Sequence, residues 1–238
     1  YFARLSQQFI SAITSLTSEG RIFEIDMRLR PSGNSGPIAT SIESFEQYHD
    51  SSSWTWEKMA LTRAKPIAGD KMIIDKINLL LKKILSKQIP QEILLNDILS
   101  MRERIKKQYN RDKWQIKNSP GGLLDIQFLA QYLQLLYSSN HTDILDQKIK
   151  NIFINLKERN LLNSDIADNI IEISDMQFNL HAIISLCFKD TADQTKFSDE
   201  ISSKLINILN VKNKFELNLK LGYLQNSIIN YFNTITNL

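Results

Sequence analysis

The stretch that decides the front of the fold is residues 24–33, which read Glu24-Ile25-Asp26-Met27-Arg28-Leu29-Arg30-Pro31-Ser32-Gly33. Apolar and charged side chains alternate from Glu24 to Arg30, and this period of two is typical of a strand with one buried face. The pattern predicts a strand over residues 21–30. Because proline cannot continue the ladder of a central strand and glycine favours turns, a loop is predicted over residues 31–37.

The charged face of this strand carries the strongest chemical signal in the chain. It presents, in order, Glu24, Asp26, Arg28 and Arg30, about 6 to 7 Å apart along the strand. A carboxylate can hold a hard divalent cation, and paired guanidinium groups bind phosphate oxygens, so the face suits a metal–triphosphate site. The alternative is a half-buried strand whose outer face carries only solvated charge pairs.

Glycine and proline divide the chain into two regions. Most of the 7 glycines and 5 prolines lie in the first 70 residues, and after Gly122 only Gly222 and no proline occurs. Since both residues interrupt helices, the front is predicted to be mixed and the back helical, with the boundary between Gly69 and Asp70. The expected fold class is therefore α+β over residues 1–69, followed by an all-α helical bundle over residues 70–238.

Apolar residues recur at spacings of three and four along most of the chain, as on one face of a helix. In the front region they predict helices over residues 2–16, from residue 41 onward and over 54–64. In the back region the predicted helices span residues 70–85, 90–108, 123–138, 143–160, 164–188, 198–210 and 213–236. A short extended segment is predicted over residues 114–117.

Composition excludes several classes of protein. The 238 residues are 42% hydrophobic and 23% charged, which argues against intrinsic disorder. The net charge of +3 is too small to predict nucleic-acid binding, and no apolar run is long enough to predict a membrane span. The single Cys187 excludes an internal disulfide, so a cytoplasmic location is expected. The chain has no initiator Met, and we expect it to be a piece of a longer protein.

Other candidate groups carry weaker signals. His49, His141 and His181 lack the spacing of metal ligands, and surface or core roles are expected for them. Cys187 lies in an apolar helical run and is predicted to be in the core. The basic residues from Arg102 to Lys107 alternate with apolar ones and are predicted to form the exterior of a helix.

Three motifs, in order, resemble bacterial glutamine synthetase adenylyltransferases. Residues 24–33, with Gly36-Pro37 and Thr40-Ser41, are similar to their V-D-x-R-L-R-P-S-G…G-x-x-x-T-S segment. Two later stretches resemble their W-T-W-E…A-L-x-R-A helix and their I-K…G-G-x-x-D-I-E-F segment; they are Trp54-Thr55-Trp56-Glu57 with Ala60-Leu61 and Arg63-Ala64, and Ile116-Lys117 with Gly121-Gly122-Leu123-Leu124-Asp125-Ile126-Gln127-Phe128. The resemblance covers residues 21–137.

The resemblance implies an activity and a fold. These enzymes have two nucleotidyltransferase halves, each followed by a helical domain, and the W-T-W-E form resembles the carboxyl-terminal half, which attaches AMP from ATP to a tyrosine of glutamine synthetase. The implied fold is the carboxyl-terminal part of a polymerase-β-type nucleotidyltransferase domain, followed by a helical bundle. Implied partners are glutamine synthetase, a PII-type signal protein and ATP, with no nucleic acid and no membrane.

The resemblance also implies site residues. Asp26 matches the third carboxylate of the family's site, where it would help to hold catalytic Mg²⁺ and activate the attacking tyrosine hydroxyl. Arg28 and Arg30 match the two arginines of the motif, and we predict phosphate contact for them from their charge and face. Glu24 is expected to contact the metal ligands and not to bind the metal itself.

Two departures from the family pattern limit the prediction. The G-S-x(n)-D-x-D motif, which supplies the other two carboxylates, does not occur in residues 1–238, so the isolated chain is expected to be inactive. Gln127 stands where the family has Glu, which removes a charge.

Two alternatives to an adenylylating enzyme are open from the sequence. The first is a non-catalytic helical module, or a remnant, that binds glutamine synthetase or a PII-type signal protein. The second is the related uridylyltransferase of the signal protein, which we disfavour because its additional C-terminal regulatory domains have no room here.

Overall fold

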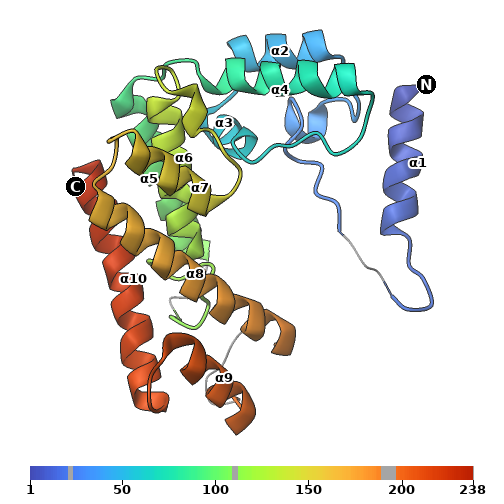
Figure 1. Ribbon diagram of the computed structural model, residues 1–238. Coiled ribbons are helices and arrows are strands. Elements are labelled where there is room, and N and C mark those ends of the chain that lie inside the picture. Colours follow the sequence, from blue (N-terminus) through green and yellow to red (C-terminus); the bar gives the residue numbers. More distant parts are fainter. Residues whose placement is uncertain (21–23, 109–111, 189–196, 238) are drawn as a thin grey trace. The chain divides into compact units, whose positions relative to one another are not determined.

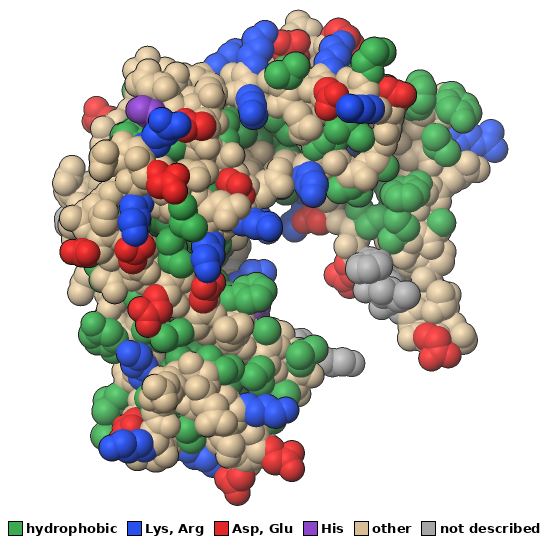
Figure 2. Space-filling view, viewed as in Figure 1, with side chains coloured by type: hydrophobic (Ala, Val, Ile, Leu, Met, Phe, Trp, Pro, Cys, Tyr) green, Lys and Arg blue, Asp and Glu red, His purple; other side chains and the backbone are tan. Residues whose placement is uncertain are grey.

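The computed structural model describes residues 1–20, 24–108, 112–188 and 197–237, and in these ranges the regular secondary structure is helical apart from one isolated bridge (Figure 1). It divides into two compact units, Tyr1–Leu85 and Ser86–Leu238. None of the described helices is both long and apolar enough to cross a membrane. On the face drawn in Figure 2, basic and acidic side chains are interspersed.

The first unit contains four α-helices among its described residues: α1 (Phe2–Thr14), α2 (Ile42–Ser51), α3 (Thr55–Leu61) and α4 (Lys71–Leu85). Both α2 and α3 pack against α4 (Figure 1). The helix predicted from residue 41 onward begins as expected, because the Ser41 side chain accepts a hydrogen bond from the Ser44 N–H. The domain boundary predicted between Gly69 and Asp70 remains a prediction.

The strand predicted over residues 21–30 does not appear in its described part, residues 24–30. Residues 24–27 are irregular and residues 28–30 turn, while residues 21–23 lie outside the described residues. A strand requires backbone hydrogen bonds to a neighbouring strand, and the one bridge in the described ranges joins Thr17 and Gly20. The alternating pattern therefore has no partner there, and the expected α+β character of the front is not observed. The extended segment predicted at residues 114–117 was also wrong, since the chain turns there.

The second unit is a helical bundle, as predicted. Its described helices are α5 (Gln91–Gln108), α6 (Leu123–Tyr137), α7 (Ile149–Glu158), α8 (Ser164–Cys187), α9 (Asp199–Leu209) and α10 (Lys214–Thr236). Helix α6 lies at the centre, because α5, α7, α8 and α10 all contact it. Its side chains are buried around most of its circumference, Ile126, Leu129 and Leu133 among them. The helix predicted over residues 143–160 is shorter, since a 3-10 turn at Thr142–Ile144 precedes α7.

Cys187 is exposed, so the prediction that it belongs to the core was wrong. The buried stripe of α8 runs through Leu180 and Ile184. One further helical turn leads from Ile184 to Phe188, whose ring contacts that of Phe197. Cys187 therefore lies beside the stripe.

A buried ion pair joins α5 to α6. The Arg102 guanidinium donates to both carboxylate oxygens of Asp125, each at 2.7 Å, and both side chains are about one-tenth exposed or less. The guanidinium carbon also lies 3.7 Å from the centre of the Phe232 ring, on α10. The prediction that Arg102 lies on a helix exterior was therefore wrong, whereas Arg104, two residues on, is exposed.

The same carboxylate fixes the loop that precedes α6. The Gly121 N–H donates to Asp125 Oδ2 at 2.8 Å, and the Gly121 carbonyl accepts from Gln177 Nε2 at 2.9 Å. Gly121 has φ of +71°, and a Cβ on it would lie 2.0 Å from the Gln225 carbonyl oxygen. Only glycine fits there, because a side chain would collide with the backbone of α10.

Loss of one member of the buried pair should be costly. We expect Asp125→Asn to lower the free energy of unfolding of the second unit by about 3–5 kcal/mol, because it leaves the Arg102 charge buried and uncompensated. Urea unfolding in a Trp54→Phe, Trp56→Phe background, where the fluorescence comes from Trp114 (3% exposed), measures this change. Asp175→Asn, which breaks the exposed pair with Lys150, is the control and should change stability by less than about 1 kcal/mol. An equal cost for the two variants would contradict the prediction.

Candidate functional site

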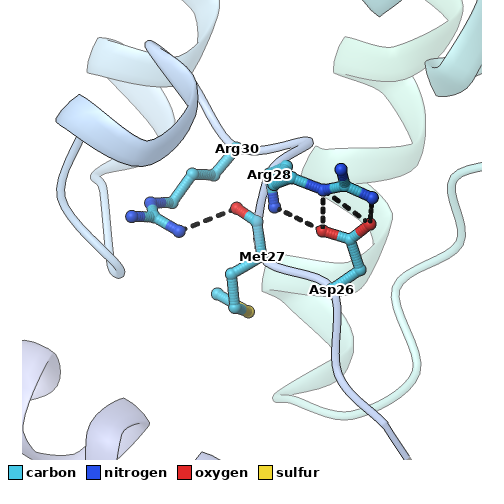
Figure 3. A network of polar contacts seen from close by, with 4 residues as sticks. All are labelled: Asp26, Met27, Arg28 and Arg30. Atoms are coloured by element: carbon cyan, nitrogen blue, oxygen red, sulfur yellow. Dashed lines mark hydrogen bonds and ion pairs between the residues drawn. The ribbon is translucent and has the colours of Figure 1, made fainter.

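The predicted site residues Asp26 and Arg28 lie together as an exposed ion pair (Figure 3). Arg28 Nε lies 2.9 Å from Asp26 Oδ1, and Arg28 Nη2 lies 2.6 Å from Asp26 Oδ2. The backbone N–H of Arg28 also donates to Asp26 Oδ1, at 2.9 Å. The side chains of Arg28 and Asp26 are 75% and 52% exposed, so both groups are accessible from solvent.

Arg30 points away from this pair and toward the loop that follows it (Figure 3). Its guanidinium donates to three backbone carbonyls: Met27 at 2.7 Å, Gly36 at 3.0 Å and Asn34 at 3.3 Å. The side chain therefore holds the two ends of the loop together. The phosphate contact predicted for Arg30 remains a prediction, and these bonds use three of the five N–H groups of the guanidinium.

The loop itself has a tight backbone. Ser32 and Gly33 both have positive φ, 61° and 55°, and a 3-10 turn follows at Gly33–Ser35. A Cβ on Gly36 would lie 1.9 Å from the Pro31 carbonyl oxygen, so the chain closes on itself there. The sequence predicted this loop from its glycines and prolines.

The electrostatics of the pair favour the ionised carboxylate. The hydrogen bonds from the Arg28 side chain and then its backbone N–H lower the pKa of Asp26 from 3.8 to about 2. In return, the Asp26 carboxylate raises the pKa of Arg28 above its ordinary value. Asp26 is therefore an anion at any physiological pH.

The described residues do not by themselves fit a Mg²⁺ ion. They contain no group of three or more His, Cys, Asp or Glu side chains placed to hold a metal. Mg²⁺ takes about six oxygen ligands in near-octahedral geometry, and Asp26 supplies one carboxylate that is already paired with Arg28. Glu24 is exposed, and no bond joins it to the pair.

A second polar cluster close to this loop in sequence was missed by the sequence analysis. Glu57, which is 5% exposed, accepts from the Tyr48 hydroxyl and from the Trp54 N–H, each at 2.8 Å. Burial and the adjacent Glu57 raise the pKa of Tyr48, whereas burial lowers the pKa of His49. The only available sequence signal was a Glu at the third position of a helix, which is typical of a residue that caps the helix start. This cluster fixes the start of α3.

Two family models match the chain. The model described as glutamate-ammonia ligase adenylyltransferase matches residues 1–78, and the model described as GlnD PII-uridylyltransferase matches residues 96–198. The first match includes Asp26, Arg28 and Arg30. The second lies within the helical bundle and includes Asp125.

Curated relatives match most of this chain but only part of their own length. Bifunctional glutamine synthetase adenylyltransferase/adenylyl-removing enzymes from Bradyrhizobium diazoefficiens and Brucella suis are 37% and 38% identical over 191 and 200 residues. These alignments cover 80% and 83% of this chain, and 19% and 20% of the relatives. An enzyme of the same name from Rhodopseudomonas palustris is 35% identical over 202 residues. The chain thus spans about a fifth of the length of the relatives it matches.

The pairing of Asp26 with Arg28 predicts a measurable titration. In Arg28→Gln the pKa of Asp26 should rise from about 2 toward 3.8, because the carboxylate loses its charged donor. Since the folded-state pKa is lowered, the pair stabilises the protein above pH 3.8 and loses this effect as the pH falls toward 2. Carbon-13 NMR of the Asp carboxyls follows the titration. Arg4→Gln, an exposed change on α1, should leave the pKa of Asp26 at about 2.

Proposed function

Because the chain belongs to the glutamine synthetase adenylyltransferase family over the part that it matches, we propose that it is part of an enzyme that transfers AMP from ATP to a tyrosine of glutamine synthetase. Such an enzyme regulates nitrogen assimilation. The observation that carries the proposal is the match of residues 1–78 to the adenylyltransferase family model, since that range contains the Asp26 loop. The W-T-W-E form of residues 54–57 favours the adenylylating half.

In this proposal residues 1–69 complete a nucleotidyltransferase domain of the polymerase-β type. The alternating residues up to Met27, before the turn at residues 28–30, would then pair as a strand with strands outside this chain. Their pattern of apolar and charged side chains supports this, because it is the pattern of a strand that buries one face. Residues 70–238 would form the helical domain that follows.

We assign Asp26 and Arg28 to the binding of metal-bound ATP. Asp26 would be one of the carboxylates that hold Mg²⁺, together with carboxylates outside this chain, and Arg28 would contact the phosphates of ATP. Both side chains are exposed, and exposed ion pairs are weakly held, so their mutual bonds do not bar new partners. A single carboxylate cannot supply the oxygen ligands and negative charge that two Mg²⁺ ions need, so the isolated chain should be inactive.

A second candidate function concerns the helical unit. The PII-uridylyltransferase family model matches residues 96–198, and the enzyme named there acts on a PII signal protein. A helical module that binds a PII-type protein or glutamine synthetase without catalysis is therefore the competing proposal. It predicts binding by residues 86–238 and no dependence on Asp26.

Adenylyl transfer from labelled ATP to purified glutamine synthetase tests the first proposal. The protein used joins to this chain the segment of the Bradyrhizobium relative that precedes its aligned part, where the family resemblance implies the G-S-x(n)-D-x-D motif. We expect transfer by the joined protein, none by the 238-residue chain alone, and a loss of about a hundredfold or more in Asp26→Asn. Asp75→Asn, an exposed change on α4, is the matched control and should retain full activity.

Transfer that Asp26→Asn leaves intact would contradict the site assignment. A folded joined protein that binds glutamine synthetase or a PII-type protein but transfers nothing would favour the binding module.

A further inference from the structure

One peptide unit near the candidate site is held on both of its sides. The carbonyl of Met27 accepts a hydrogen bond from Arg30 Nη1 at 2.7 Å. The N–H of the same peptide, which belongs to Arg28, donates to Asp26 Oδ1 at 2.9 Å. Figure 3 shows these two bonds on either side of the peptide, with the Arg30 side chain on one side and the Asp26 carboxylate on the other. The orientation of this peptide therefore couples Arg30 to Asp26.

The loop that follows presents further acceptors to Arg30. The turns that form them are closed by backbone hydrogen bonds: the Gly33 N–H donates to the Arg30 carbonyl at 2.8 Å, and the Gly36 N–H to the Gly33 carbonyl at 3.2 Å. As a result, the carbonyls of Asn34 and Gly36 reach the same guanidinium as that of Met27. Glycine at position 36 permits this tight turn, because a Cβ there would lie 1.9 Å from the Pro31 carbonyl oxygen.

The chemistry of this arrangement is specific to arginine. Its donors lie in one plane and in fixed directions, so a single side chain can bond three carbonyls on different sides. A lysine ammonium has its donors on one atom and cannot reproduce the same spread. Arg30 is also less exposed than Arg28, which suits a residue that faces its own backbone.

We infer that Arg30 is a positioning residue: through the Met27–Arg28 peptide it orients the Asp26 carboxylate, and with it the Arg28 guanidinium. The inference rests on the proposed function only in giving Asp26 a role in catalysis. The coupling itself is a property of residues 26–36. Arg30 thus acts on the site through the backbone.

NMR of the 238-residue chain, labelled with nitrogen-15 in arginine and glycine, tests the coupling without ATP. In the wild type, the two Nη groups of Arg30 should give separate signals, because each bonds a different carbonyl and rotation is restricted. In Arg30→Lys the amide signal of Arg28 should move toward its position in Asp26→Ala, where the acceptor is absent. Gly36→Ala, which displaces a carbonyl bonded by Arg30, should move it in the same direction.

The control is Arg104→Lys, an exposed change on α5, which should leave the Arg28 amide unmoved. An unmoved Arg28 amide in folded Arg30→Lys overturns the inference, as do averaged Nη signals in the wild type. Movement of the Gly33 and Gly36 amides alone would also overturn it, because Arg30 would then only close the loop.

These readouts are independent of the transfer assay. If the joined protein transfers no AMP but the Arg28 amide shifts as expected, the proposed function fails and the coupling stands. If transfer depends on Asp26 but the amide does not move, only the coupling fails.

Discussion

The fold of the second unit depends on the buried positive charge of Arg102. The Arg102 guanidinium is buried against Asp125 on one side and the Phe232 ring on another, so three helices must be in place for it to be compensated. A buried ion pair stabilises the folded state little more than apolar residues of the same size would, but its hydrogen bonds form in few geometries. Asp125 also accepts the Gly121 N–H, and this extends the constraint to the loop before α6. The bundle is thus specified by a polar contact as well as by apolar packing.

The candidate site in the first unit has a different construction. The hydrogen bonds of Asp26, Arg28 and Arg30 join residues within six positions of one another in the chain. Local bonds of this kind can shape a loop without any help from a core. They leave the carboxylate and one guanidinium facing solvent, which suits groups that must exchange partners when a charged ligand arrives. The stable and the adaptable parts of this chain therefore use the same residue types, Asp and Arg, at opposite extremes of burial.

The helices could be predicted from sequence because their signal is local. Stripes of apolar residues in α4 and α10 depend only on spacing, and so do capping residues such as Ser41. The strand at residues 24–30 could not be judged in this way, because a strand exists only with a partner and the described residues supply none. A period of two shows which side chains share one face of a strand, but it does not show whether the strand has a hydrogen-bonded partner.

The sequence also failed to predict which polar residues are buried. Arg102 and Arg104 lie two residues apart in the same basic stretch, yet one is buried and the other exposed. Helical spacing places Arg102 on the same buried face as Leu94 and Ile98, but the groups that compensate its charge, Asp125 and Phe232, lie 23 residues and more further along the chain. For the site, the sequence predicted the residue types and the loop, and the resemblance supplied a role for Asp26. The bonds of Arg30 to the carbonyls of Met27, Asn34 and Gly36 have no signal in the sequence, because they depend on how the loop folds back.

The closure of the Gly121 loop by α10 has a kinetic consequence. Gln225 bonds Ser119 and the Lys113 carbonyl across 106 and 112 residues, and Asn218 bonds Trp114 across 104. Contacts that distant in sequence form slowly, because a long segment of chain must be ordered first. Helices α5 to α8 can therefore associate as each is synthesised, while residues 113–121 cannot make these contacts until α10 has been synthesised. The most constrained backbone in this unit is thus expected to be the last part of it to become native.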